Sequence, residues 1–597
     1  MTTNRRPAPF PVTIQLQRAY DCLQRGERTA AEAHCAALLK QQPEHPEALH
    51  LMGLLALQGK RLRKAVELIG KSLALQPGNA VAHSNHAAAL QALGDLPGAL
   101  ASYNNAIVYD PRFLEAHFNR GIVLGQLDRP QEAVDSFSRA VTLCPDFAAA
   151  YEQRGAALQR LEQWDAALAS YDQALAHAPR NADAYVNRGV VLRALKRPQD
   201  ALGSYERALA LDPQHVPAHV NRGNVLRQLE RWDEALASYQ RALDVRPDCV
   251  EAMCHRGNVY NETNRLDLAI AAYDAALALA PQYVEARCNR AVAHLLAGRL
   301  EQGWIDYEWR RKLRPRAFAV PLWRGREPLA GKTVLLHGEQ GFGDTLQFCR
   351  YAPAVAALGA RVILEAQAPL VTLLGSLGGV TAVIAQGDAL PRVDYHCPLL
   401  SLPFAFKTTL ATIPATPAYL TADAAKAARW RATLGVTALP RIGLVWSGSD
   451  VENNNRKLRL ADLIEYLPES CEYVCLQKEL SAEDAALLAR HPRIREVSAH
   501  LHDFSDTAAL CSTLDRVVSI DTGVAHLAAA LGRPTAILLP FSPDWRWLLS
   551  RSDSPWYPTV TLYRQAQLAD WSAALAGLRD SLLAQDSLLA DRLPLPR

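Results

Sequence analysis

The residues best suited to chemistry lie in the stretch RVVSIDTGVAHLAAALGRP, residues 516–534. A β-branched run ends in Asp521-Thr522-Gly523, and a helical pattern follows at once. Such a turn gathers backbone N–H groups and the positive end of a helix at one point, which suits a phosphate or diphosphate. We expect Asp521 to cap the helix, Gly523 to permit close backbone approach and His526 to reach the same point. The alternative is an ordinary βα turn with an Asp cap and a packing histidine.

A second candidate is the glycine-rich loop GEQGFGDT, residues 338–345, which follows a strand-like run over 333–337. Its G-x-x-G-x-G spacing does not fit the dinucleotide fingerprint, and no P-loop lysine follows. Asp344 would stand at the carboxyl end of the strand, where it could take the proton of an attacking hydroxyl or merely cap the next helix. Glu339, earlier in the loop, is the reserve base. The sequence has no D-x-D pair, which argues against a metal-dependent sugar transferase.

The elements that must position these residues alternate between strands and helices, which predicts parallel sheets with helices on both faces. Strands are expected at 333–337, 361–365 and 381–385, and then at 441–449, 473–476 and 517–520. We therefore predict two Rossmann-like halves, 331–424 and 425–597, the second ending in a C-terminal helix, with ligands at the carboxyl ends of the strands. Residues 313–330, rich in proline and arginine, are predicted to be a loosely docked linker.

The first half of the chain is a repeat array. Proline recurs every 34 residues, at Pro43, Pro77, Pro111, Pro145, Pro179, Pro213, Pro247 and Pro281. Glycine, alanine and aromatic residues recur in fixed register with these prolines. We expect two helices per unit, small residues where the helices cross, the aromatic in the gap between them, and the proline at the end of the second helix. The array is predicted over 12–312, after a tail of residues 1–11, and its period resembles the tetratricopeptide repeat.

One polar column runs through the array at the sixth position of each unit. It consists of Asn85, Asn119, Gln153, Asn187, Asn221, His255 and Asn289. A side-chain amide both donates and accepts hydrogen bonds, so such a column could hold an extended peptide by its backbone. The alternative is that asparagine is simply common at this position of the repeat. The column resembles the asparagine ladder of the eukaryotic O-GlcNAc transferase solenoid.

Composition and charge exclude several functions. The net charge of +3 gives no footprint for nucleic acid. No apolar run is long enough to span a bilayer, and the N-terminus lacks the apolar core of a secretory signal. The 11 cysteines are scattered without a C-x-x-C pair, so we interpret them as reduced thiols of a cytoplasmic protein and expect no metal site.

Three pieces of the second half together resemble the heptosyltransferase group of glycosyltransferase family 9, over roughly 331–565. They are Gly343-Asp344 after the first strand, VWSGS at 445–449 with a basic residue following, and DTGVAHLAAALGRP. The resemblance implies a GT-B fold of two Rossmann-like halves, a nucleotide-sugar donor in the C-terminal half and an acceptor in the N-terminal half. It also implies inversion at the sugar carbon, with no metal and no other cofactor.

The same resemblance implies roles for individual residues. The donor diphosphate would be held by Asp521, Thr522, Gly523 and His526. Lys457, with Arg456 as an interchangeable candidate, would offset the charge of the leaving group, and Asp344 would be the general base. The loop before Asp344 departs from the small-residue run usual in the family. The identity of the donor sugar cannot be carried over from the family to this chain.

The whole layout resembles bacterial proteins in which repeats are fused to such a transferase. We therefore predict an α-solenoid followed by an α/β GT-B fold, and a glycosyltransferase whose acceptor is a protein or peptide recruited by the repeats. Two alternatives remain open. One is a protein-binding scaffold with an inactive transferase-like domain, and the other is a transferase directed at a glycan or lipopolysaccharide.

Overall fold

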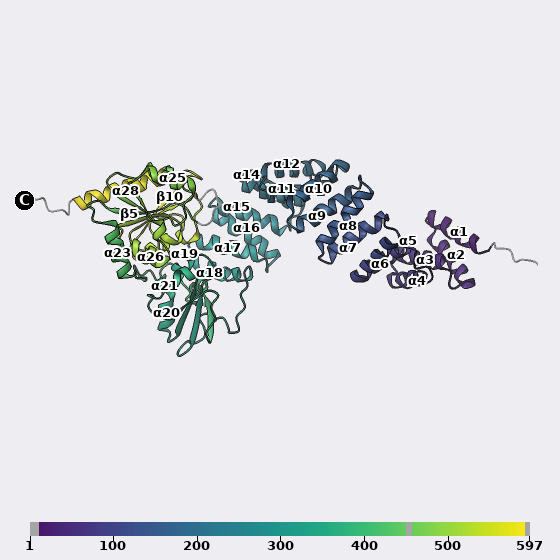
Figure 1. Ribbon diagram of the computed structural model, residues 1–597, viewed down its shortest axis with the longest axis horizontal. Helices are drawn as coiled ribbons and strands as arrows, with labels where there is room; N and C mark the ends of the chain where they lie inside the picture. The colour runs from purple at the N-terminus through teal and green to yellow at the C-terminus, as the bar shows by residue number, and fades with distance from the viewer. Residues whose placement is uncertain (1–10, 449–456, 591–597) are drawn as a thin grey trace, which may run out of the picture. The chain divides into compact units, whose positions relative to one another are not determined.

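The computed structural model describes residues 11–448 and 457–590, with side chains from 14 to 584. The chain divides into two compact units, Met1–Ala252 and Met253–Arg597. Figure 1 shows the helices of both units and the strands of the second, with labels where there is room. Within the described residues, no helix is both long enough and apolar enough to cross a membrane.

The first unit is a series of antiparallel helix pairs. They are α1 (Pro11–Gln24), α2 (Arg28–Gln41), α3 (Pro46–Gln58), α4 (Leu62–Leu75), α5 (Ala80–Leu93), α6 (Leu96–Tyr109), α7 (Leu114–Gln126), α8 (Pro130–Leu143), α9 (Ala148–Arg160), α10 (Trp164–His177), α11 (Ala182–Ala194), α12 (Pro198–Leu211), α13 (Val216–Gln228) and α14 (Trp232–Val245). The division between the units falls inside α15 (Val250–Glu262). The predicted solenoid of two-helix repeats is confirmed.

The pairing of small and aromatic residues explains the repeat pattern. A Cβ atom added at Gly189 would come within 2.5 Å of the ring of Tyr205, which is completely buried. The same geometry joins Gly223 to Tyr239, so only glycine lets the two helices of a unit approach this closely. The repeating proline follows the second helix, as Pro213 follows α12.

The second unit begins with the last helices of the array and continues into an α/β region. The helices are α16 (Leu266–Leu279), α17 (Val284–Leu296) and α18 (Leu300–Tyr307), followed by the 3-10 turn η1 (Glu308–Lys312). They pack directly on the α/β region, because Trp304 donates from Nε1 to the carbonyl of Thr408 at 2.9 Å and meets Trp545 edge to face. The last repeat is therefore structurally part of the second unit.

The α/β region contains two parallel sheets with helices between the strands. The first sheet has the order β3-β2-β1-β4, from β1 (Thr333–His337), β2 (Arg361–Ala366), β3 (Val380–Ala385) and β4 (Tyr395–Pro398), with helices α19 (Phe342–Phe348), α20 (Ala352–Ala357), α21 (Val371–Leu374) and α22 (Leu402–Ala405). The second has the order β10-β9-β8-β5-β6-β7, from β5 (Arg441–Val445), β6 (Glu472–Cys475), β7 (Ile494–Glu496), β8 (Arg516–Ile520), β9 (Thr535–Leu539) and β10 (Val560–Arg564). Its helices are α23 (Ala424–Leu434), α24 (Leu460–Ile464), α25 (Ala482–Arg490), α26 (Phe504–Cys511), α27 (Gly523–Ala530) and α28 (Ser572–Ala590). Two Rossmann-like halves of a GT-B-like α/β region are thus present.

The segment 313–330, which we call the strap, is not the loosely docked linker that its composition suggested. Trp323 is 2% exposed, and its backbone N–H donates to the carbonyl of His396 on β4. Phe318 stacks on the His396 ring with centroids 4.0 Å apart, and the Arg316 guanidinium bonds both oxygens of Glu365 at 2.5 and 2.7 Å. Aromatic packing and a buried carboxylate therefore hold the strap against the four-stranded sheet.

Candidate functional site

The turn at the head of α27 is built differently from its sequence prediction. Thr522, not Asp521, is the N-cap: its backbone is extended and its side-chain oxygen accepts from the N–H of Ala525 at 3.4 Å. A second contact, from Ser519 Oγ at 2.9 Å, fixes the same hydroxyl. The prediction of an Asp521 cap was wrong because the carboxylate of Asp521 is occupied by another partner.

That partner is His526. Its Nε2 lies 3.4 Å from Asp521 Oδ1, while its Nδ1 lies 2.8 Å from the hydroxyl of Tyr557. The ring of Trp547 stacks on the imidazole at a centroid distance of 5.4 Å, and His526 is buried. Burial alone would raise the pKa of Asp521, but the hydrogen bond and charge of His526 outweigh it and lower that pKa. Asp521 is therefore ionised beside His526, and the contacts of both side chains hold the turn in place.

The three motifs that the sequence singled out meet at this turn. Gly448, just past β5, lies against the side chain of Thr522, since a Cβ there would be 3.5 Å from the Thr522 methyl. Gly343 of α19 approaches so closely that its Cβ would be 2.7 Å from Cδ2 of His526. The glycine-rich loop of the first Rossmann-like half is thus packed on the Asp521-Thr522-Gly523 turn of the second half.

Of the two basic candidates, Lys457 falls within the described residues. Lys457 is exposed, and its carbonyl accepts from Nε1 of Trp571 at 3.1 Å. Arg456 lies outside the described residues. The described residues contain no group of three or more His, Cys, Asp or Glu side chains that could hold a metal ion.

Asp344 is held by contacts from both halves. Its Oδ2 accepts from the N–H of Gly341 at 2.9 Å, which closes the start of α19, and its Oδ1 pairs with Arg546. Arg546 lies in the 3-10 turn η7 (Trp545–Trp547) and also bonds Gln347 at 2.5 Å and Asp544 at 2.7 Å. Asp344 therefore does stabilise the start of α19, but it is the third residue of the helix and not its N-cap. The N-cap is Gly341, which has no side chain to play that part.

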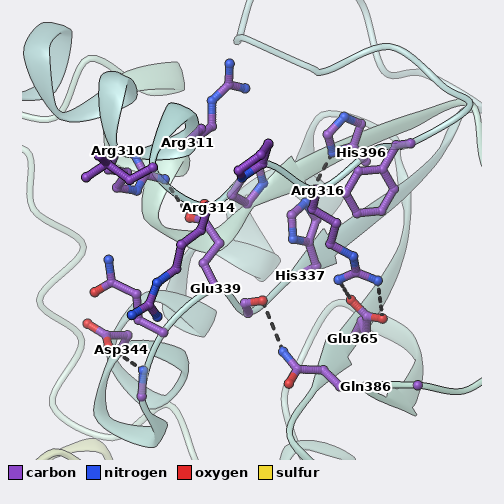
Figure 2. Close-up of a pocket in the computed structure, with 18 residues that line it drawn as sticks. Arg310, Arg311, Arg314, Arg316, His337, Glu339, Asp344, Glu365, Gln386 and His396 are labelled. Atoms are coloured by element: carbon purple, nitrogen blue, oxygen red, sulfur yellow. Dashed lines mark hydrogen bonds and ion pairs between the residues drawn. The ribbon is translucent and has the colours of Figure 1, made fainter. Parts of the chain in front are cut away.

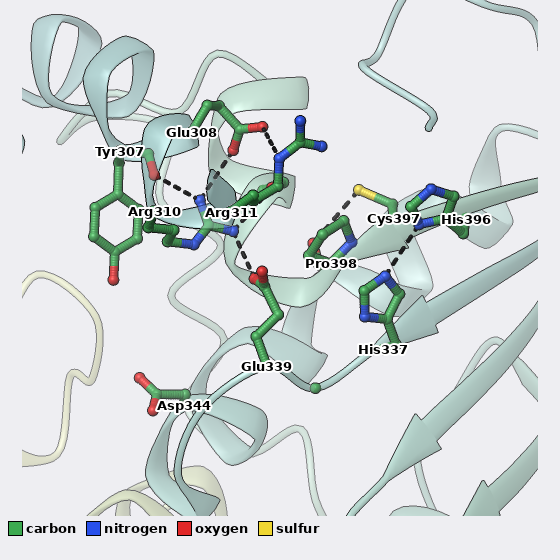
Figure 3. A network of polar contacts seen from close by, with 12 residues as sticks. Tyr307, Glu308, Arg310, Arg311, His337, Glu339, Asp344, His396, Cys397 and Pro398 are labelled. Atoms are coloured by element: carbon green, nitrogen blue, oxygen red, sulfur yellow. Dashed lines mark hydrogen bonds and ion pairs between the residues drawn. The ribbon is translucent and has the colours of Figure 1, made fainter. Parts of the chain in front are cut away.

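Glu339 has a simpler environment (Figure 3). Its carboxylate accepts from Nη2 of Arg310 at 2.6 Å. The same guanidinium donates to Ser401 Oγ at 2.9 Å and to the carbonyl of Tyr307 at 2.9 Å, and Arg310 is buried. Burial raises the pKa of Glu339 above its ordinary value, and the charge of Arg310 only partly opposes this. A residue of η1, directly after the last repeat helix, therefore sets the position of this carboxylate.

Glu339 and Asp344 both line a pocket of about 1310 Å³ over the four-stranded sheet (Figure 2). Its floor is the carboxyl ends of β1, β2 and β4. Its far wall is formed by arginines of η1 and the strap, namely Arg310, Arg311, Arg314 and Arg316. These arginines were missed as site residues, although the run RRKLRPR at 310–316 was the available signal.

The amide column of the array is divided by its contacts. Asn85 Nδ2 lies 2.9 Å from His50 Nε2, and Asn289 donates to Asn258 at 2.9 Å. The other three asparagines are half-buried and have no side-chain hydrogen bond to another described residue; they are Asn119, Asn187 and Asn221.

Comparison with protein families assigns both parts of the chain. Tetratricopeptide repeat models match 16–80, 114–147, 153–216, 220–284 and 262–303, and a TPR repeat model matches 89–128. The model of glycosyltransferase family 9 (heptosyltransferase) matches 462–544. The chain therefore combines tetratricopeptide repeats in its N-terminal region with a glycosyltransferase family 9 domain near its C-terminus.

Individual relatives share only parts of the chain. Protein FlbA of Caulobacter vibrioides is 27% identical over 323 residues, which are 48% of this chain and 53% of that protein, so the chain spans about half the length of this curated relative. Among solved structures, a thermophilic TPR protein of Thermus thermophilus is 27% identical with a TM-score of 0.27, covering 30% of this chain and 99% of that one. YrrB, described as a TPR protein with an unusual peptide-binding site, is 23% identical with a TM-score of 0.27, covering 31% and 95%. These scores are too low to support a functional conclusion.

Proposed function

We propose that the protein is an inverting, metal-independent glycosyltransferase that moves a sugar from a nucleotide-sugar donor to a hydroxyl of a protein acceptor. The observation that carries the proposal is the family 9 match over 462–544, which includes the Asp521-Thr522-Gly523 turn at the head of α27. That turn stands at the carboxyl end of β8, the edge at which parallel sheets bind ligands.

On the donor side, the backbone N–H groups at the start of α27 would bind the diphosphate, with Asp521 and His526 holding the turn in shape. Lys457, and Arg456 beside it, would offset the charge that develops on the leaving group. Because the side chains of Asp521, Thr522 and His526 already have partners within the protein, the turn would not need to reorganise during the reaction.

On the acceptor side, the two candidate bases are not equivalent. Both oxygens of Asp344 have partners, and the guanidinium of Arg546 stabilises its charged form. The carboxylate of Glu339 is bound by a single guanidinium, that of Arg310. Its pKa is raised towards neutral pH, and a general base is most effective when its pKa lies near the working pH. We therefore assign proton abstraction to Glu339 and a positioning role to Asp344.

The test compares Glu339→Gln with Asp344→Asn. The first should lower transfer about 10²- to 10⁴-fold while a nucleotide sugar still raises the melting temperature, because the base acts only on the acceptor proton. The second should lower transfer less and lower thermal stability more. A Glu339→Gln enzyme with near wild-type transfer would exclude Glu339 as the base. Donor sugars that never shift the melting temperature would refute the transferase itself.

The repeat array favours a protein as the acceptor, because stacked repeats form a long surface that can bind a peptide, and this surface carries the amide column. Asn119, Asn187 and Asn221 are the members whose amides bond no other described residue, so their simultaneous replacement by Ala should weaken protein glycosylation several-fold. Replacement of Asn85 and Asn289, whose amides bond within the array, is the matched control and should mainly affect stability. Equal effects of the two sets on glycosylation would contradict peptide binding by the column.

A second candidate is a scaffold that binds proteins without catalysis. The specific observation in its favour is the tight packing of Gly343 on His526, which closes the two halves on each other at the donor turn. Under this alternative, no nucleotide sugar would bind, whereas partner proteins would still depend on Asn119, Asn187 and Asn221.

A further inference from the structure

We propose that the pocket over the four-stranded sheet is a binding site for an anionic group, a carboxylate or phosphate, and that its natural ligand is an acidic side chain next to the modified hydroxyl of a protein acceptor. The role in transfer rests on the proposed function. The anion site itself can be measured without any transfer.

The charges of the pocket leave one cation over. Glu365 is paired with Arg316 and Glu339 with Arg310. Arg311 forms an ion pair with Glu308 of η1, with 3.6 Å between Nε and the carboxylate. Asp344 is paired with Arg546, which is not among the lining residues. Among the described residues Arg314 has neither an ion pair nor a hydrogen bond, and Figure 2 shows it in the same space as Glu339 and Asp344. An exposed guanidinium in a concave site is suited to bidentate binding of a carboxylate or phosphate.

Three buried nitrogen atoms of the lining also lack hydrogen-bond partners among the described residues. They are Nδ1 of His337, Nε of Arg310 and Nε of Arg311. His337 is 3% exposed, and its other nitrogen is occupied by His396 at 3.1 Å. Arg311 Nε lies 3.6 Å from Glu308, beyond hydrogen-bond distance. Buried polar atoms without partners are unfavourable in a folded protein, so three of them in residues that line one pocket favour a polar ligand there.

His337 is buried next to several positively charged side chains of the pocket. Burial lowers the pKa of His337 to about 3, and the neighbouring His396 and the guanidinium groups of Arg316, Arg310 and Arg311 act in the same direction. Burial is the larger cause and acts whatever the sign of the surrounding charge, and the guanidinium groups add to it. The imidazole therefore remains neutral and able to share a hydrogen bond with a ligand.

The origin of the arginines favours a protein ligand over a free glycan. All four precede β1, and they lie outside the segment 462–544 that matches the glycosyltransferase family. They belong to η1 and the strap, which continue directly from α18, the last helix of the array. The wall of the anion site is thus continuous in sequence with the repeat array.

The experiment titrates the full-length chain with two fluorescent peptides, one with serine between two aspartates and one with asparagines in their place. The acidic peptide should bind at least about tenfold more tightly. Arg314→Gln should remove that advantage, because it deletes the unpaired cation without breaking a hydrogen bond or ion pair of the described residues. Arg326→Gln is the control: Arg326 is an exposed arginine of the same strap that does not line the pocket, and binding should change less than about twofold.

Equal binding of the two peptides, or equal losses in Arg314→Gln and Arg326→Gln, would overturn the inference. Inorganic phosphate is the second probe and should displace the acidic peptide from wild-type chain only. Binding of phosphate without binding of the peptide would overturn the assignment to a protein acceptor. A chain that binds the acidic peptide but transfers no sugar would refute the proposed function and leave the anion site standing.

Discussion

The polar side chains at the carboxyl ends of the two sheets differ in how completely their hydrogen-bonding groups are paired. At the six-stranded sheet, Asp521 contacts His526, His526 contacts Tyr557, and Thr522 closes the helix. At the four-stranded sheet, Nδ1 of His337 is buried with no partner among the described residues, and Arg314 is left over. The first arrangement is typical of a rigid, preformed turn, and the second retains free hydrogen-bonding capacity for a ligand.

The difference indicates how the two substrates would be recognised. A donor diphosphate is chemically constant, so the turn that we propose for it can be fully preorganised. An acceptor varies, and a pocket that leaves donors unsatisfied gains free energy only when the matching group arrives. Three substitutions test this contrast; in each, unfolding can be followed by tryptophan fluorescence, because nine of the 11 tryptophans lie in Met253–Arg597.

The largest effect is expected for Arg546→Met, which removes the residue that ties the two regions together. Arg546 is buried and pairs with Asp344 and Asp544, so its loss leaves two carboxylates without their cation. The free energy of unfolding should fall by about 3–5 kcal/mol. The control is Arg579→Met, which breaks an exposed pair with Asp580 and a cation–π contact at 5.9 Å from the ring of Tyr466, and it should cost less than about 1 kcal/mol. Similar losses in both would show that Arg546 is not a structural tie.

A smaller effect is expected for Gly343→Ala. The added methyl would lie 2.7 Å from Cδ2 of His526, so α19 or the imidazole must move, at a cost of about 1–3 kcal/mol. Gly341→Ala is the matched control two residues away, because its Cβ would meet only Asp344 Oδ2 at an ordinary 3.5 Å. Donor binding should weaken in the first variant alone. If both variants unfold like wild type, the close contact between the two regions does not exist.

The smallest effect separates the two regions by pH. The folded pKa of His337 is lowered to about 3, so between roughly pH 6.5 and 3 the unfolded chain binds a proton that the folded chain does not, and stability falls with acid by up to about 1.4 kcal/mol per unit. The folded pKa of Asp521 is also lowered, so its stabilisation is complete above the unfolded value of about 3.9 and is lost only below it. His337→Asn should therefore flatten the slope measured by denaturant unfolding from pH 6.5 to 5.

The control for this measurement is His502→Asn, since His502 is exposed. It should leave the slope unchanged. An unchanged slope in His337→Asn as well would mean that His337 does not remain neutral in the folded protein.

The sequence was most informative where a pattern repeats or a strand is apolar throughout. The 34-residue spacing of proline placed the solenoid, and the run TVLLH marked β1 at its observed bounds. Less was accessible where a short segment is defined by its partner. The strand β4, Tyr395–Pro398, is only four residues long, and β1 and the strap hold it in place.

The candidate site shows the same limit. The contact of Gly448 with the DTG turn follows from their positions after β5 and β8, which are neighbours in one parallel sheet. The approach of Gly343 from the other sheet depends on how α19 packs on α27, which the sequence did not predict. The choice of Thr522 over Asp521 as the cap could not be predicted, because it depends on His526 and Tyr557 being close in space. The strap arginines were recognised as basic residues of a linker, but only the fold shows that the linker forms the wall of a pocket.

The boundary inside α15 has a consequence for how such a chain can change over evolutionary time. Units before it contact mainly their neighbours, so whole 34-residue blocks can be gained or lost by duplication without touching the α/β region. The block that ends in α18 has no such freedom, because Trp304 and Arg310 anchor it to the sheet that carries the pocket. We therefore expect relatives to differ in the number of early repeats and to retain the last one together with the α/β region.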